Sequence, residues 1–576
     1  MDLDIPASGK TGKSPFKTST PAVSEWVANL PLINIKDCVE QLEFALDELN
    51  KIDVPAAERH AALELLTAPV MHVIGALKKS YLGKRIPLRK QDLDNAAKAS
   101  GLCNRMAISY KILVTTLGNQ PESGSTSSAL ATAIHHAIRY LSEVLTGNYQ
   151  IYAPYPDGIW KALHTLYATG EQHALLRHQV DDISPGYPEK STIEESYKQI
   201  LLLSLACPYR LRQNEISGVY KLLSQWARYS KLLSKSEGHS GGFFTWDLDS
   251  DDAPTYLTIK NQQARATQSR FLNTSDMEEP IRAALKAHQE STQRFSDYME
   301  ERILQRLMLT WGLMPKRQFA RRRQDAAIQM VSGLKAIHRI ITEPTPEGSE
   351  EAQEKTGVTR DRESLCDPTL EQPTTINTDA HNGNGNGAGH LPDQWQENPL
   401  QGAYSARNPD AGNGDATPLY AENWKMQDMS AGGYCLLWDS AEASSAQIGE
   451  LVAIKTSHDR DENWHLGVIR WMKFFRERGL GLGVQMMSPG ARAVWARLCD
   501  GKAGTGDKLQ GILLPDVEGL HQQATLLLPS LPFRSGCLSQ LTRGDVEKQV
   551  RLTTRLEDTG SFAQFYFSPA NESCAP

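Results

Sequence analysis

Apolar residues recur every three or four positions over much of the first half of the chain, which predicts a region built of helices. This pattern runs from about Leu32 to Ser234, and Ser191 with Glu194 fits a capping box at the start of one helix. No strict period establishes a helical repeat, so a bundle and an irregular solenoid both remain open. A later amphipathic run, from about Glu278 to Trp311, predicts one long charged helix.

A short stretch near residues 242–258 interrupts the helical pattern. An aromatic run is followed there by acids and a proline, which predicts a strand and a turn. The acids are Asp247, Asp249, Asp251 and Asp252. They lack the glycine and the terminal glutamate of a calcium loop, so we expect a solvated turn and no metal site.

The last third of the chain has the pattern of strands. β-Branched and aromatic runs between Gly, Asp and Ser clusters predict one small β-barrel after residue 420 and a second after residue 508. Alternating apolar residues over Ala326–Ile341 predict a strand of the first barrel, paired with Glu422–Gln427. Ser488 and Pro489 fit the N-cap and first position of a helix that ends near Cys499.

Two segments lack the apolar residues that a folded core needs. Residues 1–30 are polar and rich in Ser, Thr, Pro and Lys, and residues 342–419 include an Asn-Gly alternation and few large apolar side chains. Such segments cannot bury enough surface to offset the entropy of ordering, so we expect both to be disordered. The second is a long insertion, which is tolerated because closure entropy grows only slowly with loop length.

The fold class that follows is multidomain α + β. We expect an N-terminal all-α region, a β-barrel interrupted by a disordered insertion, and a second small C-terminal β-barrel. The predicted boundaries are a tail at 1–30, a helical domain at 31–312 with its β excursion, a barrel formed by 313–341 and 420–500 around the insertion 342–419, and a β-domain at 508–576.

Composition narrows the class of protein. The 576 residues carry 61 basic and 68 acidic side chains, a formal net charge of −7, which argues against a surface that coats nucleic acid. The longest apolar stretches are far too short to span a bilayer, and the acidic N-terminus does not fit a secretory signal. The eight cysteines are scattered and suggest neither a zinc site nor a disulfide framework. We therefore expect a cytoplasmic protein without a metal or cofactor.

Motifs for catalysis or for binding a mononucleotide or dinucleotide are weak. Residues 7–14, ASGKTGKS, look like the end of a phosphate loop but lack its first glycine and the strand before it. Gly479, Gly481 and Gly483 lie in a strand pattern with no helix start after them, so they do not fit a dinucleotide fingerprint. No nucleophile, base and stabiliser can be assembled, and we predict that the protein is not an enzyme.

Two other motifs carry more information. Lys316–Arg323 holds five cations in eight residues, including an R-x-x-x-R at Arg317 and Arg321 just before a predicted strand. A D-x-S-x-x-G pattern between two later strands consists of Asp428, Ser430 and Gly433. Taken singly, the first is explained as a basic turn or a nonspecific phosphate contact and the second as a β-turn. Together they form a specific signal.

This pair of motifs resembles the PilZ domain family, small β-barrels that bind the bacterial second messenger cyclic di-GMP. The resemblance covers about Lys316–Ile341 and Tyr420–Cys499, and it departs from the family in the long insertion between the motifs. It implies that Arg317, Arg321, Asp428, Ser430 and Gly433 bind cyclic di-GMP. Arg322 and Arg323 leave an ambiguity of register and are auxiliary candidates.

The chemistry of the ligand suits these residue types. A planar guanidinium can pair with the O6/N7 edge of guanine, pair with phosphate, or stack on a purine, and a lysine cannot reproduce this fork. Asp428 can accept hydrogen bonds from the N1–H and amino group of guanine, and Ser430 offers a small hydroxyl. Gly433 would let the backbone pass close to the ligand.

The resemblance therefore implies a cytoplasmic cyclic di-GMP receptor that contacts an unidentified protein partner through its helical domain. Control of motility, pili or surface attachment is the kind of output that the family suggests. The alternative is an adaptor that works without nucleotide, as PilZ relatives lacking the motifs do. A nucleic-acid binder using the basic octet is disfavoured by the acidic net charge and by the lack of interleaved aromatics.

Overall fold

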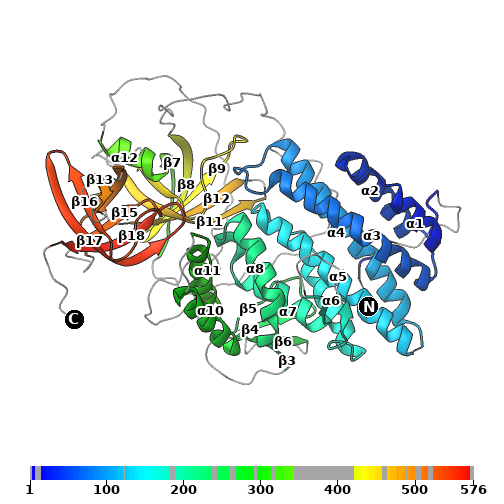
Figure 1. The fold of residues 1–576 in the computed structure, drawn as a ribbon. Coiled ribbons are helices and arrows are strands. Elements are labelled where there is room, and N and C mark those ends of the chain that lie inside the picture. Colours follow the sequence, from blue (N-terminus) through cyan, green and yellow to red (C-terminus); the bar gives the residue numbers. More distant parts are fainter. Residues whose placement is uncertain are drawn as a thin grey trace.

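The chain folds as a helical domain followed by two β-barrels, which the computed structural model places side by side (Figure 1). The structure describes residues 3–6, 15–121, 123–181, 188–234, 243–258, 268–290, 295–312, 320–342, 421–456, 464–476, 478–487, 490–499, 507–516 and 523–570. The predicted fold class is confirmed. The predicted insertion, residues 342–419, lies outside the described residues except for Thr342.

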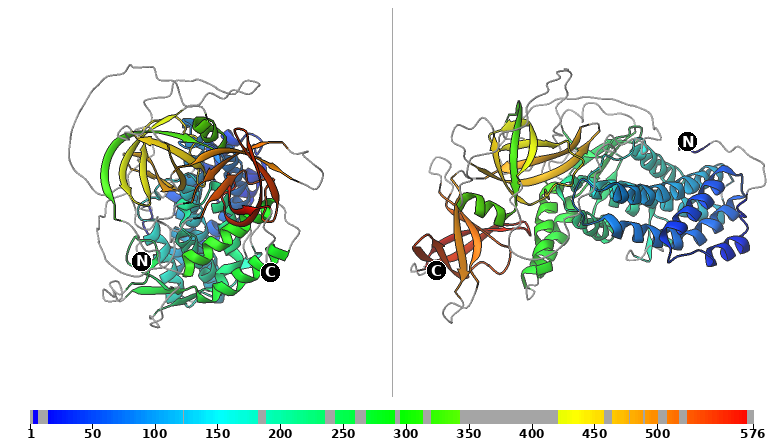
Figure 2. Two further views of the ribbon diagram at one scale, coloured as in Figure 1. Left: turned by 90° about the vertical axis from the view of Figure 1, so that its left-hand side faces the viewer. Right: turned by 90° about the horizontal axis from the view of Figure 1, so that it is seen from above.

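The helical domain is an irregular bundle in which α3, α4 and α5 form the long central helices (Figures 1 and 2). Its helices are α1 (Thr20–Ala28), α2 (Ile35–Lys51), α3 (Ala56–Tyr81), α4 (Lys90–Gly118), α5 (Gly124–Gln150), α6 (Ile159–Gln172), α7 (Ile193–Leu205) and α8 (Gln213–Trp226), with a two-stranded ribbon of β1 (Val180–Asp181) and β2 (Lys190–Ser191) before α7. Among the described helices, α3 is long and apolar enough to cross a membrane, and half of its most apolar stretch is buried within the protein.

Two predictions about this domain are wrong in detail. Residues 20–28, predicted to be part of a disordered tail, form α1, in which Val23 is buried. Phe16 and Val23 of this polar segment are buried in the apolar core of the bundle, and local composition cannot reveal such packing. The capping box of α7 is formed by Thr192 and Glu195, one residue later than predicted, while the Ser191 hydroxyl bonds to His135.

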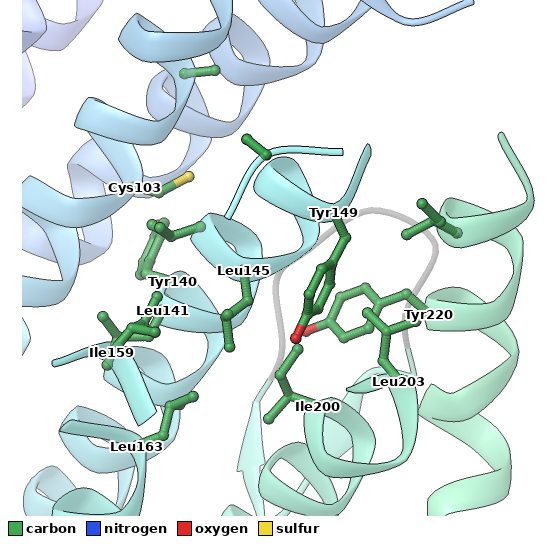
Figure 3. Packing of buried hydrophobic residues seen from close by; sticks show 14 of the residues in the cluster. Cys103, Tyr140, Leu141, Leu145, Tyr149, Ile159, Leu163, Ile200, Leu203 and Tyr220 are labelled. Atoms are coloured by element: carbon green, nitrogen blue, oxygen red, sulfur yellow. The ribbon is translucent and has the colours of Figure 1, made fainter. Parts of the chain in front are cut away.

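The bundle has a continuous apolar core. Tyr149 of α5, Ile200 and Leu203 of α7, and Tyr220 of α8 converge in the close view of Figure 3, and each is almost completely buried. Side chains of this size contribute roughly 1.5–3 kcal/mol each when they are removed from water. The same cluster continues into the interior of the first barrel, so the two parts are packed as one body.

His164 of α6 lies in this core between two polar partners. Its Nδ1 is 2.6 Å from the Tyr197 hydroxyl and its Nε2 is 3.0 Å from the carbonyl oxygen of Asp252. Burial lowers the pKa of His164 to about 4 because the imidazolium would lose its hydration. The neutral ring is therefore the form that the fold accommodates.

Acid should accordingly destabilise the protein through His164. The unfolded state binds a proton near the usual histidine pKa of about 6.5 and the folded state only near pH 4, so stability falls as the pH drops through this interval, by roughly 3 kcal/mol in total. Urea unfolding at pH 7 and pH 5 measures the loss, which should be smaller in His164→Gln. The exposed His72 supplies the control: if His72→Gln reduces the acid sensitivity as much, His164 is not its source.

A small sheet and two helices follow the bundle. The sheet has the order β3-β6-β4-β5, formed by β3 (Lys231–Leu233), β4 (Phe243–Asp247), β5 (Thr255–Tyr256) and β6 (Ser269–Asn273). The carboxylate of Asp251 in its acidic turn accepts hydrogen bonds from the backbone N–H groups of Gly158 and Lys161, so this turn caps α6. The predicted long helix is seen as α10 (Glu278–Glu290) and α11 (Phe295–Gly312).

The first barrel is closed by six antiparallel strands in the order β10-β11-β12-β9-β8-β7. Its strands are β7 (Arg322–Ser332), β8 (Glu422–Ser430), β9 (Gly433–Trp438), β10 (Leu451–Thr456), β11 (His465–Phe475) and β12 (Gly479–Met486). The predicted strand over Ala326–Ile341 ends at Ser332, and α12 (Leu334–Thr342) follows it. Gly333, with a φ of +98°, makes the turn between them, a backbone conformation that disfavours other residues.

The second barrel also has six strands, in the order β13-β14-β15-β18-β17-β16. They are β13 (Arg492–Leu498), β14 (Leu509–Leu514), β15 (Thr525–Leu528), β16 (Leu538–Arg543), β17 (Val546–Asp558) and β18 (Ala563–Pro569). The predicted helix over Ser488–Cys499 is wrong, because β13 occupies most of it and buries Val494 and Ala496 at alternate positions. The second barrel therefore begins at Arg492 and not near residue 508.

The two barrels share a layer of apolar side chains. Helix α12 leaves the first barrel and packs on the second, where His338 Nε2 lies 3.1 Å from the carbonyl oxygen of Val494. The shared cluster contains Ile337 of α12 together with residues of both barrels: Val331, Leu451, Ala453, Leu466 and Val468 of the first, and Ile512, Leu514, Leu527 and Phe562 of the second. Separating the barrels would expose this layer to water.

Candidate nucleotide-binding site

The two predicted motifs meet at one edge of the first barrel. Strands β7 and β8 pair antiparallel, with Met330 opposite Glu422 at one end and Arg323 opposite Asp428 at the other. Just before β7, the Nη1 atom of Arg321 lies 3.5 Å from Oδ1 of Asp428. Side chains from opposite sides of the long insertion are thus neighbours in space.

Burial increases the strength of this pairing. Asp428 is 6% exposed, and the side chain of Arg321 is 18% exposed. Two opposite charges at such a site interact more strongly than a pair in water, because nearby protein replaces part of the solvent. The site therefore holds a cationic fork against a carboxylate acceptor, the two functions that a guanine or a phosphate requires.

The register distinguishes between the auxiliary arginines. Arg323 is directly opposite Asp428 and shares its face of the sheet, whereas Arg322 is opposite Met429 and points to the other face. A β-bulge follows between Arg323 and Ala326 and locally increases the twist of this edge. Arg317 lies outside the described residues.

The serine and glycine of the second motif form the turn between β8 and β9. Ser430 is opposite Gly433, and its hydroxyl donates a hydrogen bond of 3.4 Å to the carbonyl oxygen of Gly433. A Cβ atom on Gly433 would lie 2.0 Å from the carbonyl oxygen of Val484 on β12. Glycine is therefore required for the close approach of two strands, whether or not a ligand passes nearby.

Substituting Gly433 with alanine should destabilise the barrel by about 1–3 kcal/mol, because the added methyl collides with backbone that cannot rotate away. Urea unfolding measures the loss. Gly218→Ala is the matched control, since a Cβ at Gly218 of α8 meets nothing within 4 Å. Equal stability of Gly433→Ala and wild type would contradict the close approach.

A row of paired residues connects the site with the far side of the barrel. Asp428 pairs with Cys435, Cys435 with Gly483, and Gly483 with Trp471, so these four positions share one face. A Cβ on Gly483 would lie 1.9 Å from Nε1 of Trp471, so the indole lies directly over this glycine. Sequence reasoning missed Trp471, although the alternating glycines after residue 478 were the available signal for a covering aromatic ring.

The strand that carries Trp471 also touches the helical domain. The backbone N–H of Phe474 donates a 2.7 Å hydrogen bond to the carbonyl oxygen of Tyr152, and Lys473 Nζ lies 5.0 Å from the centre of the Tyr209 ring. Strand β11 therefore connects the row of paired residues that begins at Asp428 with the helical domain.

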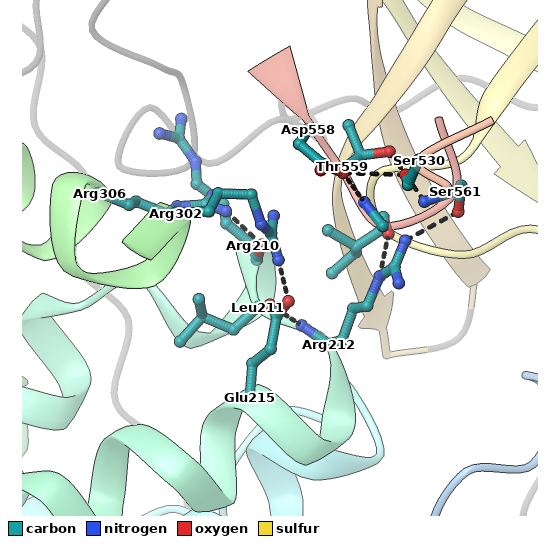
Figure 4. A network of polar contacts seen from close by, with 12 residues as sticks. Arg210, Leu211, Arg212, Glu215, Arg302, Arg306, Ser530, Asp558, Thr559 and Ser561 are labelled. Carbon is teal, nitrogen blue, oxygen red and sulfur yellow. Dashed lines mark hydrogen bonds and ion pairs between the residues drawn. The ribbon is translucent and has the colours of Figure 1, made fainter. Parts of the chain in front are cut away.

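A polar junction joins the helical domain, α11 and the second barrel (Figure 4). On the helical side, Arg302 of α11 forms an ion pair with Glu215, and Arg306 donates a 2.7 Å hydrogen bond to the carbonyl oxygen of Arg210. Burial lowers the pKa of Arg302 to about 10, which reflects how fully this junction excludes water.

Arg212 extends the junction to both barrels. Its Nε donates a 2.8 Å hydrogen bond to the carbonyl oxygen of Ile448 in the first barrel, and its Nη2 donates a 2.9 Å bond to the Ser561 hydroxyl in the second. Glu301 of α11 also forms an ion pair of 3.4 Å with Arg555 of the second barrel, so α11, which leads into the arginine motif, is held between the bundle and the second barrel.

Within the described residues, no three His, Cys, Asp or Glu side chains gather as a metal site would require. At the β7–β8 edge a guanidinium and a carboxylate lie together instead, two groups that can pair with a phosphate and a base. Two motifs meet on neighbouring strands of this six-stranded barrel. One is the arginine motif before β7, and the other is the D-x-S-x-x-G turn after β8. Together these features define a class of protein.

Comparisons with known proteins agree with this class. Residues 21–236 match the family described as the N-terminal domain of the cyclic-di-GMP receptor FimW, residues 243–493 match its middle PilZ domain, and residues 494–570 match the FimW C-terminal beta-barrel domain. The middle part of the chain, residues 243–493, is thus a match to a PilZ domain, as its two motifs indicated.

One curated relative extends over the whole chain. The cyclic-di-GMP receptor FimW of Pseudomonas aeruginosa is 28% identical over 593 aligned positions, which cover 100% of this chain and 95% of that protein. No solved structure matches the chain.

Proposed function

We propose that this protein is a cyclic di-GMP receptor that acts in the cytoplasm without catalysing a reaction. The observation that carries the proposal is the convergence of Arg321 and Asp428, which the chain brings together across a long insertion. The name of the Pseudomonas aeruginosa relative supports the identity of the ligand. Arg317 and Arg321 would grip guanine edges or phosphates, and Asp428 would accept hydrogen bonds from a guanine.

We also propose how nucleotide binding is transmitted to the helical domain. The arginine motif begins shortly after α11, whose residues Arg302 and Arg306 are held by the helical domain. A nucleotide that orders the arginines against β8 would favour one position of α11 relative to the barrel, and ligands shift a conformational equilibrium only through such differential contacts. The helical domain would then present a surface to a protein partner.

A calorimetric titration of the full-length protein with cyclic di-GMP tests the proposal. We expect saturable binding of cyclic di-GMP and no comparable binding of cyclic di-AMP, because adenine lacks the O6 acceptor and the N1–H and 2-amino donors that the arginines and Asp428 would use. Absence of binding, or equal binding of both dinucleotides, would contradict the assignment.

A further inference from the structure

One exposed face of α2 presents an aromatic side chain to solvent. Phe44 is 48% exposed, and Ile33, just before the N-cap Asn34, is 100% exposed. Glu40 and Phe44 are one helical turn apart and lie on the same side of α2, whereas Ile33 belongs to the turn before the helix. The opposite side of α2 is buried in the bundle.

Acidic residues surround this aromatic side chain. Glu40, Asp47 and Glu48 are four residues before, three after and four after Phe44, the positions that lie next to it on a helix. Helix α2 contains five acids, Asp37, Glu40, Glu43, Asp47 and Glu48, and two lysines, Lys36 and Lys51, a difference of −3.

Some of this charge is paired within the chain. Arg105 of α4 forms an ion pair of 2.8 Å with Asp47, and Lys51 forms one of 3.3 Å with Glu48. In the part of the chain that the structure describes, no ion pair to Glu40 is found. An acidic group therefore lies one turn from the exposed aromatic ring.

The acidic side chains and the exposed aromatic ring together favour one kind of binding partner. A second copy of the chain would bring acids against acids, and an anionic membrane surface would repel them as well. A basic segment would place its cations against the carboxylates and over the Phe44 ring, where charge-assisted bonds and cation–π attraction both favour it. Apolar side chains of that segment would cover the exposed Phe44 ring.

The position of this face also suits a partner site. Helix α2 lies at the end of the helical domain that is remote from both barrels, so a bound protein would not compete with the nucleotide site (Figures 1 and 2). We propose that the Phe44 face, formed by Glu40, Phe44, Asp47 and Glu48, binds a basic amphipathic helix of a partner protein. This inference deepens the proposed function, which assigns a protein partner to the helical domain.

Fluorescence anisotropy with two labelled 18-residue model helices tests the inference on the full-length protein. One helix carries leucine on one face and lysine on the other, and the second replaces every lysine with glutamate. We expect the lysine helix to bind wild type and to lose at least tenfold in affinity with Phe44→Ser or Glu40→Lys. Val546→Ser, at a 57% exposed apolar residue of the second barrel, should bind within twofold of wild type.

Other results would overturn the inference: no binding of the lysine helix, equal binding of both helices, or an equal loss in Val546→Ser. A wild-type dimer that dissociates in Phe44→Ser, seen by size-exclusion chromatography, would assign the face to a second copy instead. Failure here can be separated from failure of the nucleotide site. Phe44→Ser should retain the cyclic di-GMP affinity of wild type, and Arg321→Ala should retain the affinity for the lysine helix.

Discussion

Replacing Arg321 with alanine should weaken cyclic di-GMP binding by roughly 10- to 100-fold, because a bidentate guanidinium contact to guanine is worth about 1–3 kcal/mol. The same substitution removes the cation that lies 3.5 Å from Asp428, so the acceptor for the base is no longer held in place. Arg321→Lys should lose most of the affinity as well, since an ammonium group cannot form the planar fork. Calorimetric titration of each variant measures the change.

The control for this experiment is an arginine remote from the site. Arg534 is exposed on the second barrel, and Arg534→Ala should bind the nucleotide as wild type does. Urea unfolding of both variants separates a loss of binding from a loss of fold. Unchanged affinity in Arg321→Ala would remove the arginine motif from the site, whereas a wild-type titration without heat would favour the adaptor alternative.

Replacing Glu557 with glutamine should destabilise the protein by about 2–3 kcal/mol, the largest effect that we expect from a single polar substitution. Glu557 of the second barrel forms two contacts with Arg470 of the first, one of them 2.9 Å long. Although burial opposes ionisation, Arg470, Arg302 and Arg306 hold the pKa of Glu557 below its usual value. Removing one partner of such a pair leaves buried cations without compensation.

The stability that Glu557 contributes should be lost at low pH. Because the folded state lowers the pKa of Glu557, its contribution to stability is present above the unfolded pKa of about 4.5 and is lost as the pH falls through the folded value. Glu547, which pairs with Lys508 on the surface at 3.7 Å, supplies the matched control. Glu547→Gln should cost less than about 0.5 kcal/mol, and an equal cost for both substitutions would contradict a buried junction.

The spacing of apolar residues and the positions of turn-forming residues were sufficient to predict a helical region followed by two β-barrels. The three-to-four spacing of apolar residues marked the bundle, and runs of β-branched and aromatic residues marked two barrels. The proximity of Arg321 and Asp428 followed because a strand that carries the first motif pairs with one that carries the second. Family resemblance supplied the ligand, which geometry alone does not specify.

The errors have physical causes. Ser488 and Pro489 are residues of a helix start and equally of a turn, and alternate burial of Val494 and Ala496 against the second barrel decides for a strand. The predicted strand over Ala326–Ile341 extends too far because Leu334, Ile337 and Ile341 of α12 continue its apolar run, and Gly333 is the signal for the change. In both cases a tertiary partner distant in the chain determines the element.

The layer of apolar side chains between the barrels has a consequence for how this protein can be divided. A fragment ending near residue 490 would retain every strand of the first barrel yet leave Val331, Ile337 and Val468 facing water. Such a fragment should aggregate, because an exposed apolar patch of this kind drives association. We therefore expect that the first barrel cannot be fused alone to another protein. A stable fusion, whether engineered or produced by recombination, would have to contain both barrels.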